Sequence, residues 1–394
     1  MAGFPTLVLG DGSSGEIRFF AERIVDADST SRINLPIVGV GLVGIVFFLK
    51  LSLRERSIGE KLRDLDYVGL VLFTASTTAF LIPTTWGGTQ YAWGSWQTLV
   101  PLCLGAAGIV GFVLWEINTK GPKLIPMSIF RNFSTTALYF CSFIHGLLLF
   151  SIVYYMPEWF QAVKGYSPLM SGVAALPQNA TCVPCAVAVG VIVGKTGRYR
   201  WAIWLGWATT TLGMGLLIYL RVQTSIPAWI FLTIVSGIGI GLLFPSIALA
   251  VQASTPPEEA ATASTLVIWF RVFGSSLGVA IGGVIFQNRF EAELASVQPS
   301  GSISGDLPKN VVLLIEYIKH LPSGDPQREL LREILAKSFR VVWIATCVFA
   351  ACAMLVSFFV KEYSMAQEHK TEQSYRGRGD RERDEKSSGA TVVE

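Results

Sequence analysis

Charged side chains are scarce in this sequence. Only 15% of the 394 residues are charged and 51% are hydrophobic, whereas an ordinary soluble domain carries about 25% charged residues. The formal net charge is +3. This composition excludes an ordinary water-soluble domain and predicts a protein that resides in a lipid bilayer.

Residue patterns typical of enzymes are also lacking. The sequence shows no paired carboxylates, metal-ligand cluster or activated nucleophile, so we expect no enzyme activity, no metal and no cofactor. It has no phosphate-binding loop of the Walker type, which argues against an ATP-driven pump, and no nucleic-acid partner is expected. All six cysteines fall in apolar runs, and we assign Cys182-Val-Pro-Cys185 to helix packing because it has no βαβ context.

Long apolar runs recur along the chain, and a helix that crosses a membrane needs about 20 such residues. Nine spans are predicted, at residues 33–52, 66–84, 98–116, 135–157, 170–193, 201–220, 228–251, 265–286 and 339–360. Backbone groups inside the hydrocarbon must bond to one another, which helices achieve. The predicted fold class is an all-α polytopic membrane protein with about nine transmembrane helices.

Basic residues are concentrated in alternate loops, a bias that sets the orientation of membrane proteins. Ten lysines and arginines fall in the loops 53–65, 117–134 and 194–200, whereas only Lys164 and Arg221 fall in the alternating loops 85–97, 158–169 and 221–227. The first set is therefore predicted to face the cytosol. Loop 252–264 has no basic residue, so the topology rests on the sum of the loops.

The chain is predicted to divide into five segments. They are a polar segment 1–32 without a secretory signal, three spans within 33–116, a cytosolic loop 117–134, a six-helix bundle 135–360 with an outer loop 287–338, and a disordered cytosolic tail 361–394. The outer loop is too long to lack structure. We expect it to contain two short helices, one over the apolar stripe 311–321 and one that leads into the last span.

The stretch from Tyr154 to Phe160 is rich in aromatic residues at the end of a predicted span. Such residues favour the headgroup layer, so we predict an interfacial aromatic belt there. Gln161, Lys164 and Gly165 are expected to make an outer turn. Ser167-Pro168 is expected to start the next helix, because proline is tolerated in a first turn.

Several segments, in order, resemble the fungal fourteen-span drug:proton antiporters of the major facilitator superfamily. They are INLPIVG (33–39), LDYVGLVLF (65–73), PKLIPMSIFRN (122–132), YYMPEWFQAVKGYSPLMSGVAALP (154–177), GKTGRYR (194–200), STLVIWFRVFGSSLGVAIGGVIFQN (264–288) and SFRVVW (338–343). The resemblance covers roughly residues 33–365. It implies a partial major facilitator fold and proton-coupled efflux.

The register of this resemblance is that of the family's sixth through fourteenth spans. The first five spans have no counterpart in this sequence, and the glycine-rich motif G-x-x-x-G-P-x-x-G-G of the family's fifth span is absent. The loop Gly194, Lys195, Gly197, Arg198, Arg200 is similar to the second-half copy of the family's basic cytosolic loop. Its role is either gating or orientation alone.

Arg271 is the first candidate for substrate binding or gating, because it lies several residues inside a predicted span. An ionisable residue at that depth is costly unless it pairs, snorkels or lines a wet cavity. Snorkelling toward the cytosolic end is the alternative to a substrate or gating contact. The sequence does not choose between them.

Further candidates are polar or aromatic residues of the fourth and fifth predicted spans. They are Ser142, His145, Tyr155, Gln178 and Asn179. Ser142 and His145 share one helix face, and Pro177 loosens the helix just before Gln178. For His145 the alternatives are an interhelical hydrogen bond and a substrate or proton role.

Glycines spaced four apart, Gly237/Gly241 and Gly274/Gly278/Gly282, predict close approach of helix backbones. Such contacts suit helix bundles that rock around a midplane site. Taken with the resemblance, they point to a secondary transporter that exports amphipathic small molecules, such as drugs or fungal secondary metabolites, across the plasma or vacuolar membrane. The alternative is a non-transporting remnant, or a half that needs a partner.

Overall fold

The computed structural model describes residues 38–45, 65–87, 91–297, 311–322 and 324–365. The chain divides into two units, residues 1–58 with 371–394, and residues 59–370. In the first unit, residues 38–45 are described and are helical. The polar segment 1–32, most of the span 33–52, nearly all of the loop 53–65 and the tail beyond residue 365 lie outside the described residues.

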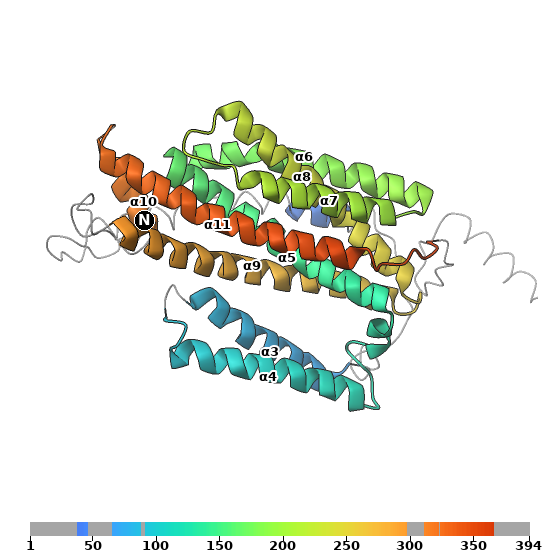
Figure 1. Ribbon diagram of the computed structural model, residues 1–394. Coiled ribbons are helices and arrows are strands. Elements are labelled where there is room, and N and C mark those ends of the chain that lie inside the picture. The colour runs from blue at the N-terminus through green and yellow to red at the C-terminus, as the bar shows by residue number, and fades with distance from the viewer. Residues whose placement is uncertain (1–37, 46–64, 88–90, 298–310, 323, 366–394) are drawn as a thin grey trace, which may run out of the picture. The chain divides into compact units, whose positions relative to one another are not determined.

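In the described part of the second unit the regular structure is helical, and the loops contain one isolated bridge, between Gly87 and Tyr91. Its helices are α3 (Tyr67–Trp86), α4 (Trp96–Asn118), the 3₁₀ turn η1 (Met127–Arg131), α5 (Phe133–Lys164), α6 (Pro168–Thr196), α7 (Arg200–Leu217), α8 (Ile226–Ser254), α9 (Ala260–Val297), α10 (Val311–His320) and α11 (Pro326–Ser357). Figure 1 shows α3 and α4 side by side next to α9, and α6, α7 and α8 on the other side of α5. The predicted all-helical membrane fold is confirmed.

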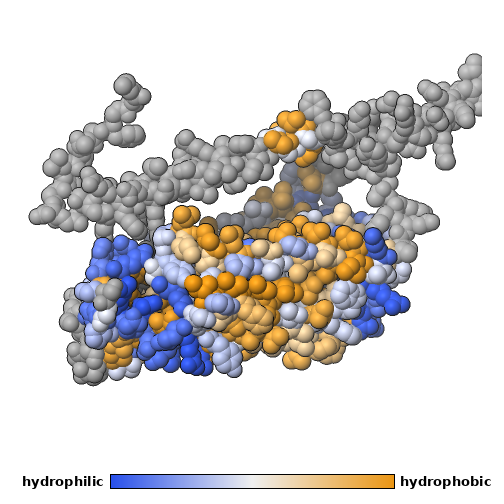
Figure 2. Space-filling model, turned by 90° about the horizontal axis from the view of Figure 1, so that it is seen from above, coloured by the Kyte–Doolittle hydropathy of each residue, from blue (hydrophilic) through white to orange (hydrophobic). Residues whose placement is uncertain are grey.

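Seven of the described helices are long and apolar enough to cross a membrane: α3, α4, α5, α6, α8, α9 and α11. Helix α7, the predicted span 201–220, falls outside this group because its 18 residues include polar threonines and Arg200. It nevertheless packs against α8 and α11. On the face drawn in Figure 2, apolar side chains gather over the middle and hydrophilic ones at the two ends, as a bilayer requires.

Side-chain caps explain where several helices begin. Asn132 accepts from the Ser134 amide at 3.0 Å at the start of α5. The hydroxyl of Ser167 accepts from the Met170 amide at 3.2 Å at the start of α6, which confirms the helix start predicted at Ser167-Pro168. Asp325 caps α11 in the same way. Each cap satisfies an amide that has no partner within the helix.

The turn after α5 is shorter than predicted. The helix continues through Pro157 to Lys164, and Gly165 ends it with a positive φ of 71°. Proline removes only one backbone donor, and the helix on both sides is held by packing. The outer connection is therefore only residues 165–167.

The predicted interfacial aromatic belt is wrong for most of its members. Tyr155, Met156, Trp159 and Phe160 are buried inside the protein, whereas Tyr154 is 53% exposed. The Phe160 ring lies 4.8 Å from that of Trp229 in α8. Because α5 remains helical past the expected span end, these rings pack against neighbouring helices and not against lipid headgroups.

The predicted outer loop 287–338 is mostly helical in its described residues. Helix α9 continues to Val297, α10 occupies Val311–His320, and α11 begins at Pro326. The polar extension of α9 carries an i,i+4 ion pair between Arg289 and Glu293, which supports a helix outside the bilayer. The two helices expected in this segment are thus present, and the second is the start of α11.

Closely packed glycines join α5 to α9. A Cβ atom at Gly278 would lie 2.9 Å from the Cα of Leu147 and would also overlap its carbonyl oxygen. Gly274 meets the α5 backbone at Phe143 in the same way, and Gly146 of α5 meets the Arg271 carbonyl, whereas Gly282 meets the side chain of Tyr155. The predicted glycine contacts are confirmed here, and Gly237 and Gly241 make the equivalent contact between α8 and α6.

Hydrogen bonds gather the loops predicted to be cytosolic at one end of the bundle. The Asn132 side-chain amide donates to the Ser254 carbonyl at 3.2 Å, and Ser128 donates to Glu259 at 2.5 Å. At the other end, Lys164 donates to the carbonyls of Val222 and Thr224, both at 2.6 Å. These contacts bring together loops that the predicted topology places on the same side.

The segment after α11, residues 360–363, is held at the first of these ends, and we call it the C-terminal latch. Tyr199 is fully buried there and donates to the Lys361 carbonyl at 3.1 Å, while it accepts from the Tyr363 amide at 2.8 Å. The Lys361 amide donates to Ser134 at 3.1 Å. The latch therefore ties α11 to the starts of α5 and α7.

Replacing Tyr199 with phenylalanine should loosen this latch, because the variant loses one donor and one acceptor. We expect a loss of about 1–2 kcal/mol in stability, seen as a lower melting temperature in detergent and faster amide exchange at residues 361–363. Tyr219→Phe is the control, since Tyr219 is exposed. Unchanged exchange in Tyr199→Phe would contradict the role of this hydroxyl.

The latch should also depend on pH. Burial raises the pKa of Tyr199 from its ordinary value of 10 to about 12, although the hydrogen bond from Tyr363 opposes this. A pKa raised by folding gives stability that is complete below the unfolded pKa and is lost as the pH rises through the folded one. Protection of the 361–363 amides, measured as the exchange rate relative to the intrinsic rate at the same pH, should therefore be constant below pH 10 and fall toward pH 12 in the wild type, but not change in this way in Tyr199→Phe.

Candidate functional site

Four hydroxyl groups of α5 bind backbone carbonyls of α9. Tyr139 donates to Ala263 at 3.2 Å, Ser142 to Val267 at 2.7 Å, Ser151 to Gly278 at 3.3 Å, and Tyr155 to Val279. These bonds and the glycine contacts hold the two helices at a fixed register. Residues 145 of α5 and 271 of α9 are thereby brought to the same level of the bundle.

His145 is fully buried and reaches from α5 to α8. Its Nε2 lies 3.1 Å from the Ile240 carbonyl oxygen, and its Nδ1 has no hydrogen-bond partner. A carbonyl can only accept, so Nε2 carries the hydrogen of the neutral ring and Nδ1 is the lone-pair nitrogen. The structure shows the predicted interhelical hydrogen bond and leaves one basic nitrogen unused.

Arg271 reaches from α9 to the next turn of α8. Its guanidinium carbon lies 4.0 Å from the ring centroid of Phe244, and Nη2 donates to the Phe244 carbonyl at 3.1 Å. The ring of His145 meets the same phenylalanine edge-on at 5.7 Å. Three helices thus converge on Phe244, and we call His145, Phe244 and Arg271 the arginine cluster.

A proline interrupts the helical hydrogen bonds of α8 beside this turn. Pro245 lies inside the helix directly after Phe244. Proline has no amide hydrogen, and its ring clashes with the carbonyl four residues earlier, which opens the helix there. The Ile240 and Phe244 carbonyls that accept from His145 and Arg271 lie on the turns next to this opening.

The contacts of Arg271 argue against snorkelling toward the cytosolic end. Arg271 lies eleven residues after Ala260, the first residue of α9, or about 16 Å along the helix axis. Its side chain is committed to Phe244 and does not extend along α9 toward the cytosolic end. The structure therefore favours a contact inside the bundle.

The other predicted residues are not all brought together. Gln178 is buried against Gly237 of α8, whereas Asn179 is exposed, so neighbouring positions in α6 face different surroundings. Tyr155 is buried against Gly282, ten residues further along α5 than His145. Of the predicted residues, Ser142, His145 and Arg271 lie in the part of the bundle where α5, α8 and α9 contact one another. Ser142 bonds to α9, and His145 and Arg271 both bond to α8.

The basic loop lies at the predicted cytosolic end. Gly197 has a φ of 69° and ends α6 by donating to the Val193 carbonyl at 2.8 Å. Lys195 and Arg198 are exposed, as is Gly194. Arg200 lies over the Trp204 ring at 4.6 Å, so of the loop's cations it is the one fixed against the protein.

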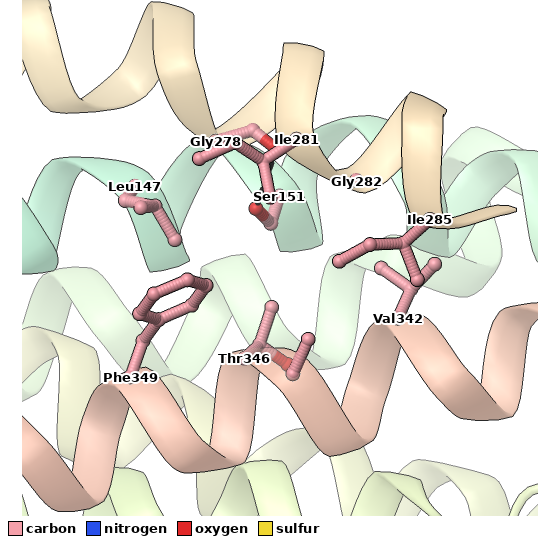
Figure 3. A pocket seen from close by; sticks show the side chains of 10 residues that line it. Leu147, Ser151, Gly278, Ile281, Gly282, Ile285, Val342, Thr346 and Phe349 are labelled. Carbon is pink, nitrogen blue, oxygen red and sulfur yellow. Dashed lines mark hydrogen bonds between the residues drawn. The ribbon is translucent and has the colours of Figure 1, made fainter.

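A small hollow lies between α5, α9 and α11 (Figure 3). Its walls include Leu147, Ile281, Val342 and Phe349, and the labelled side chains converge on it from the three helices. The hydroxyl of Ser151 is already bonded to Gly278. A space with so few free polar groups offers little recognition, so the arginine cluster is the stronger candidate site.

Sequence reasoning missed two residues of interest. Phe244 was not singled out, although an aromatic residue beside a proline within a span was a usable signal. Glu116, at the end of α4, is fully buried and accepts from the amides of Leu124 and Ile125 at 2.9 and 3.1 Å. These bonds are local and hold the turn after α4, so we assign Glu116 a structural role.

Comparison with known proteins agrees with this architecture. Residues 33–279 match the model of the Major Facilitator Superfamily, and the chain belongs to that family. It is 46% identical over 344 residues to an MFS transporter L2 of a Phoma species, with 87% of this chain and 57% of that protein covered.

Other relatives are also fungal transporters. The chain is 33% identical to efflux pump FUS6 of Gibberella fujikuroi, covering 86% of this chain and 62% of that protein, and 30% identical to the MFS-type efflux pump MMF1 of Mycosarcoma maydis, covering 92% and 58%. The chain therefore spans about 60% of the length of these relatives. A solved bacterial homologue of the lysosomal transporter Spinster aligns at 13% identity with a TM-score of 0.49, covering 74% of this chain and 64% of that one.

Proposed function

We propose that this chain acts in the secondary active export of amphipathic small molecules in exchange for protons, at the plasma membrane or the vacuolar membrane. The observation that carries the proposal is the arginine cluster: a cation held on an exposed aromatic ring, six residues, or about 9 Å, inside the predicted span 265–286. Charged residues at such depth mark transport pathways. The relatives named as efflux pumps support the direction of transport.

Proton exchange needs a group that can gain and lose a proton within the bundle. His145 is such a group, because its Nδ1 is a lone-pair nitrogen without a hydrogen-bond partner among the described residues. It touches Phe244, which Arg271 also contacts. A proton on His145 would therefore act on the same turn of α8 that holds Arg271.

Liposomes containing the purified chain would test this proposal. With an imposed pH gradient, we expect an amphipathic fluorescent probe, 1-pyrenebutyrate or 1-pyrenebutanol, to accumulate in the compartment from which protons leave. The protonophore CCCP should abolish the accumulation, and His145→Gln should uncouple it from the gradient. Folded, monodisperse protein that produces no gradient-driven flux would contradict transport by this chain and favour a half that requires a partner.

A further inference from the structure

We propose that the exported compounds are amphipathic organic acids, and that Arg271 binds their carboxylate. This inference rests on the proposed export function and deepens it by naming the chemical class of the substrate. It is carried by the unused hydrogen-bonding capacity of the arginine cluster, by its charge, and by the apolar surface around it.

The described residues do not neutralise the charge of Arg271. Among the residues that the structure describes, no aspartate or glutamate forms an ion pair with it. Its protein hydrogen bond is the one from Nη2 to a neutral carbonyl, and its buried Nε has no partner. A guanidinium carries five N–H donors in a planar fork that matches a carboxylate, so most of its binding capacity is free.

His145 provides a second, independent observation. Its side chain is fully buried, and its Nδ1 has no hydrogen-bond partner. Buried polar atoms without partners are rare in folded proteins and call for an explanation such as a ligand. Nε of Arg271 is a donor, whereas Nδ1 of neutral His145 is an acceptor, so His145 can donate to a carboxylate only when its ring is protonated. Both side chains contact Phe244.

The surroundings of Arg271 suit the apolar part of an amphipathic acid. Phe244 is 43% exposed, although the guanidinium lies on its ring. Ile268 and Val272, one turn before and directly after Arg271, are 61% and 55% exposed. An acid could place its carboxylate on the guanidinium and its apolar body on these three side chains. A cationic compound would meet an unneutralised positive charge.

An anionic group could also come from a phospholipid. The position of Arg271 favours a free acid, because the residue lies six residues, or about 9 Å, inside the predicted span 265–286 and its side chain is held toward α8. A headgroup would have to leave the interface to reach it. We therefore assign the site to the exported acid, and the experiment below includes a lipid arm.

The test uses the full chain purified in detergent and a pair of probes of equal shape, 1-pyrenebutyrate and 1-pyrenebutanol. Energy transfer from tryptophan to pyrene reports binding. We expect the acid to bind about tenfold or more tightly than the alcohol. Arg271→Gln should abolish this preference while leaving alcohol binding unchanged, and Arg271→Lys should retain part of it because the charge remains but the fork is lost. Arg289→Gln, on the same helix but paired with Glu293, is the matched control and should bind as the wild type does.

Several outcomes would overturn the inference. The wild type could bind acid and alcohol equally or bind neither, or Arg271→Gln could lose the binding of both equally. Displacement of pyrenebutyrate by phosphatidylglycerol but not by phosphatidylcholine would assign the site to a lipid headgroup. Liposome transport separates this from the proposed function. Export of the alcohol as fast as the acid would overturn the acid class and leave export standing, whereas selective acid binding without flux would support the acid site and contradict export by this chain.

Discussion

Replacing Arg271 with leucine is expected to lower export at least about tenfold while the amount of protein in the membrane stays the same. The substitution removes a charge-assisted contact, for which about 1.5–3 kcal/mol corresponds to roughly a 10- to 100-fold change. The backbone carbonyl of Arg271 that packs against Gly146 is unaffected. The measurement is dye efflux from yeast that lacks its own drug exporters, normalised to membrane abundance.

Arg289→Leu is the matched control for this prediction. It removes a cation from the same helix, but from the exposed extension where Arg289 pairs with Glu293, so export should remain near the wild-type rate. Unchanged export by Arg271→Leu would remove this residue from the functional site. A parallel fall in membrane abundance would show a role in folding.

Replacing Gly278 with leucine should have the largest effect on stability. A side chain at this position would overlap the backbone of α5 at Leu147, and the Ser151 bond to the Gly278 carbonyl would be broken. Overpacking costs about 1–3 kcal/mol where side chains can move. Here the obstacle is backbone, so we expect a loss at or above about 3 kcal/mol.

The measurement for this variant is the melting temperature and monodispersity of the purified chain in detergent. Gly111→Leu serves as the control, because Gly111 lies in α4 and has no atom within 4 Å of the position of a Cβ. That variant should elute and melt as the wild type does. A stable, monodisperse Gly278→Leu variant would show that α5 and α9 do not need the close contact.

Both predictions concern the same part of the bundle. The glycines and hydroxyls that fix α5 to α9 also fix His145 beside the turn of α8 that Arg271 contacts. A shift of α8 relative to the α5 and α9 pair would change both contacts at once. A ligand or a proton that acts on either side chain would therefore act on the position of α8.

The fold class could be predicted from the sequence because it depends on local composition. Runs of about 20 apolar residues specify membrane helices without knowledge of their neighbours, and glycines at intervals of four predicted the contacts of Gly278 and Gly241. The ends of the helices were less predictable. Helix α9 extends from Ala260 to Val297, because polar residues continue a helix outside the bilayer while hydropathy reports only the apolar part.

The aromatic residues near Pro157 show where sequence reasoning failed. Such residues are as typical of an interface as of a core, but Trp159 and Phe160 are buried, and the Phe160 ring packs against Trp229 of α8. The candidate site was predicted in part. Arg271 and His145 could be singled out because polar and ionisable residues are rare inside membrane spans. Phe244, which both contact, belongs to a third helix, so its role depends on tertiary packing.

By itself, the sequence determined that this chain is a helical membrane protein of the Major Facilitator Superfamily, because partition into lipid and family motifs are both properties of short contiguous segments. Only the tertiary structure decided that Arg271 bears on Phe244 without an acidic partner among the described residues, and that His145 keeps one nitrogen unused. Such facts depend on which helices meet and at what register. That register is set by glycine contacts and hydroxyl bonds between segments more than 100 residues apart.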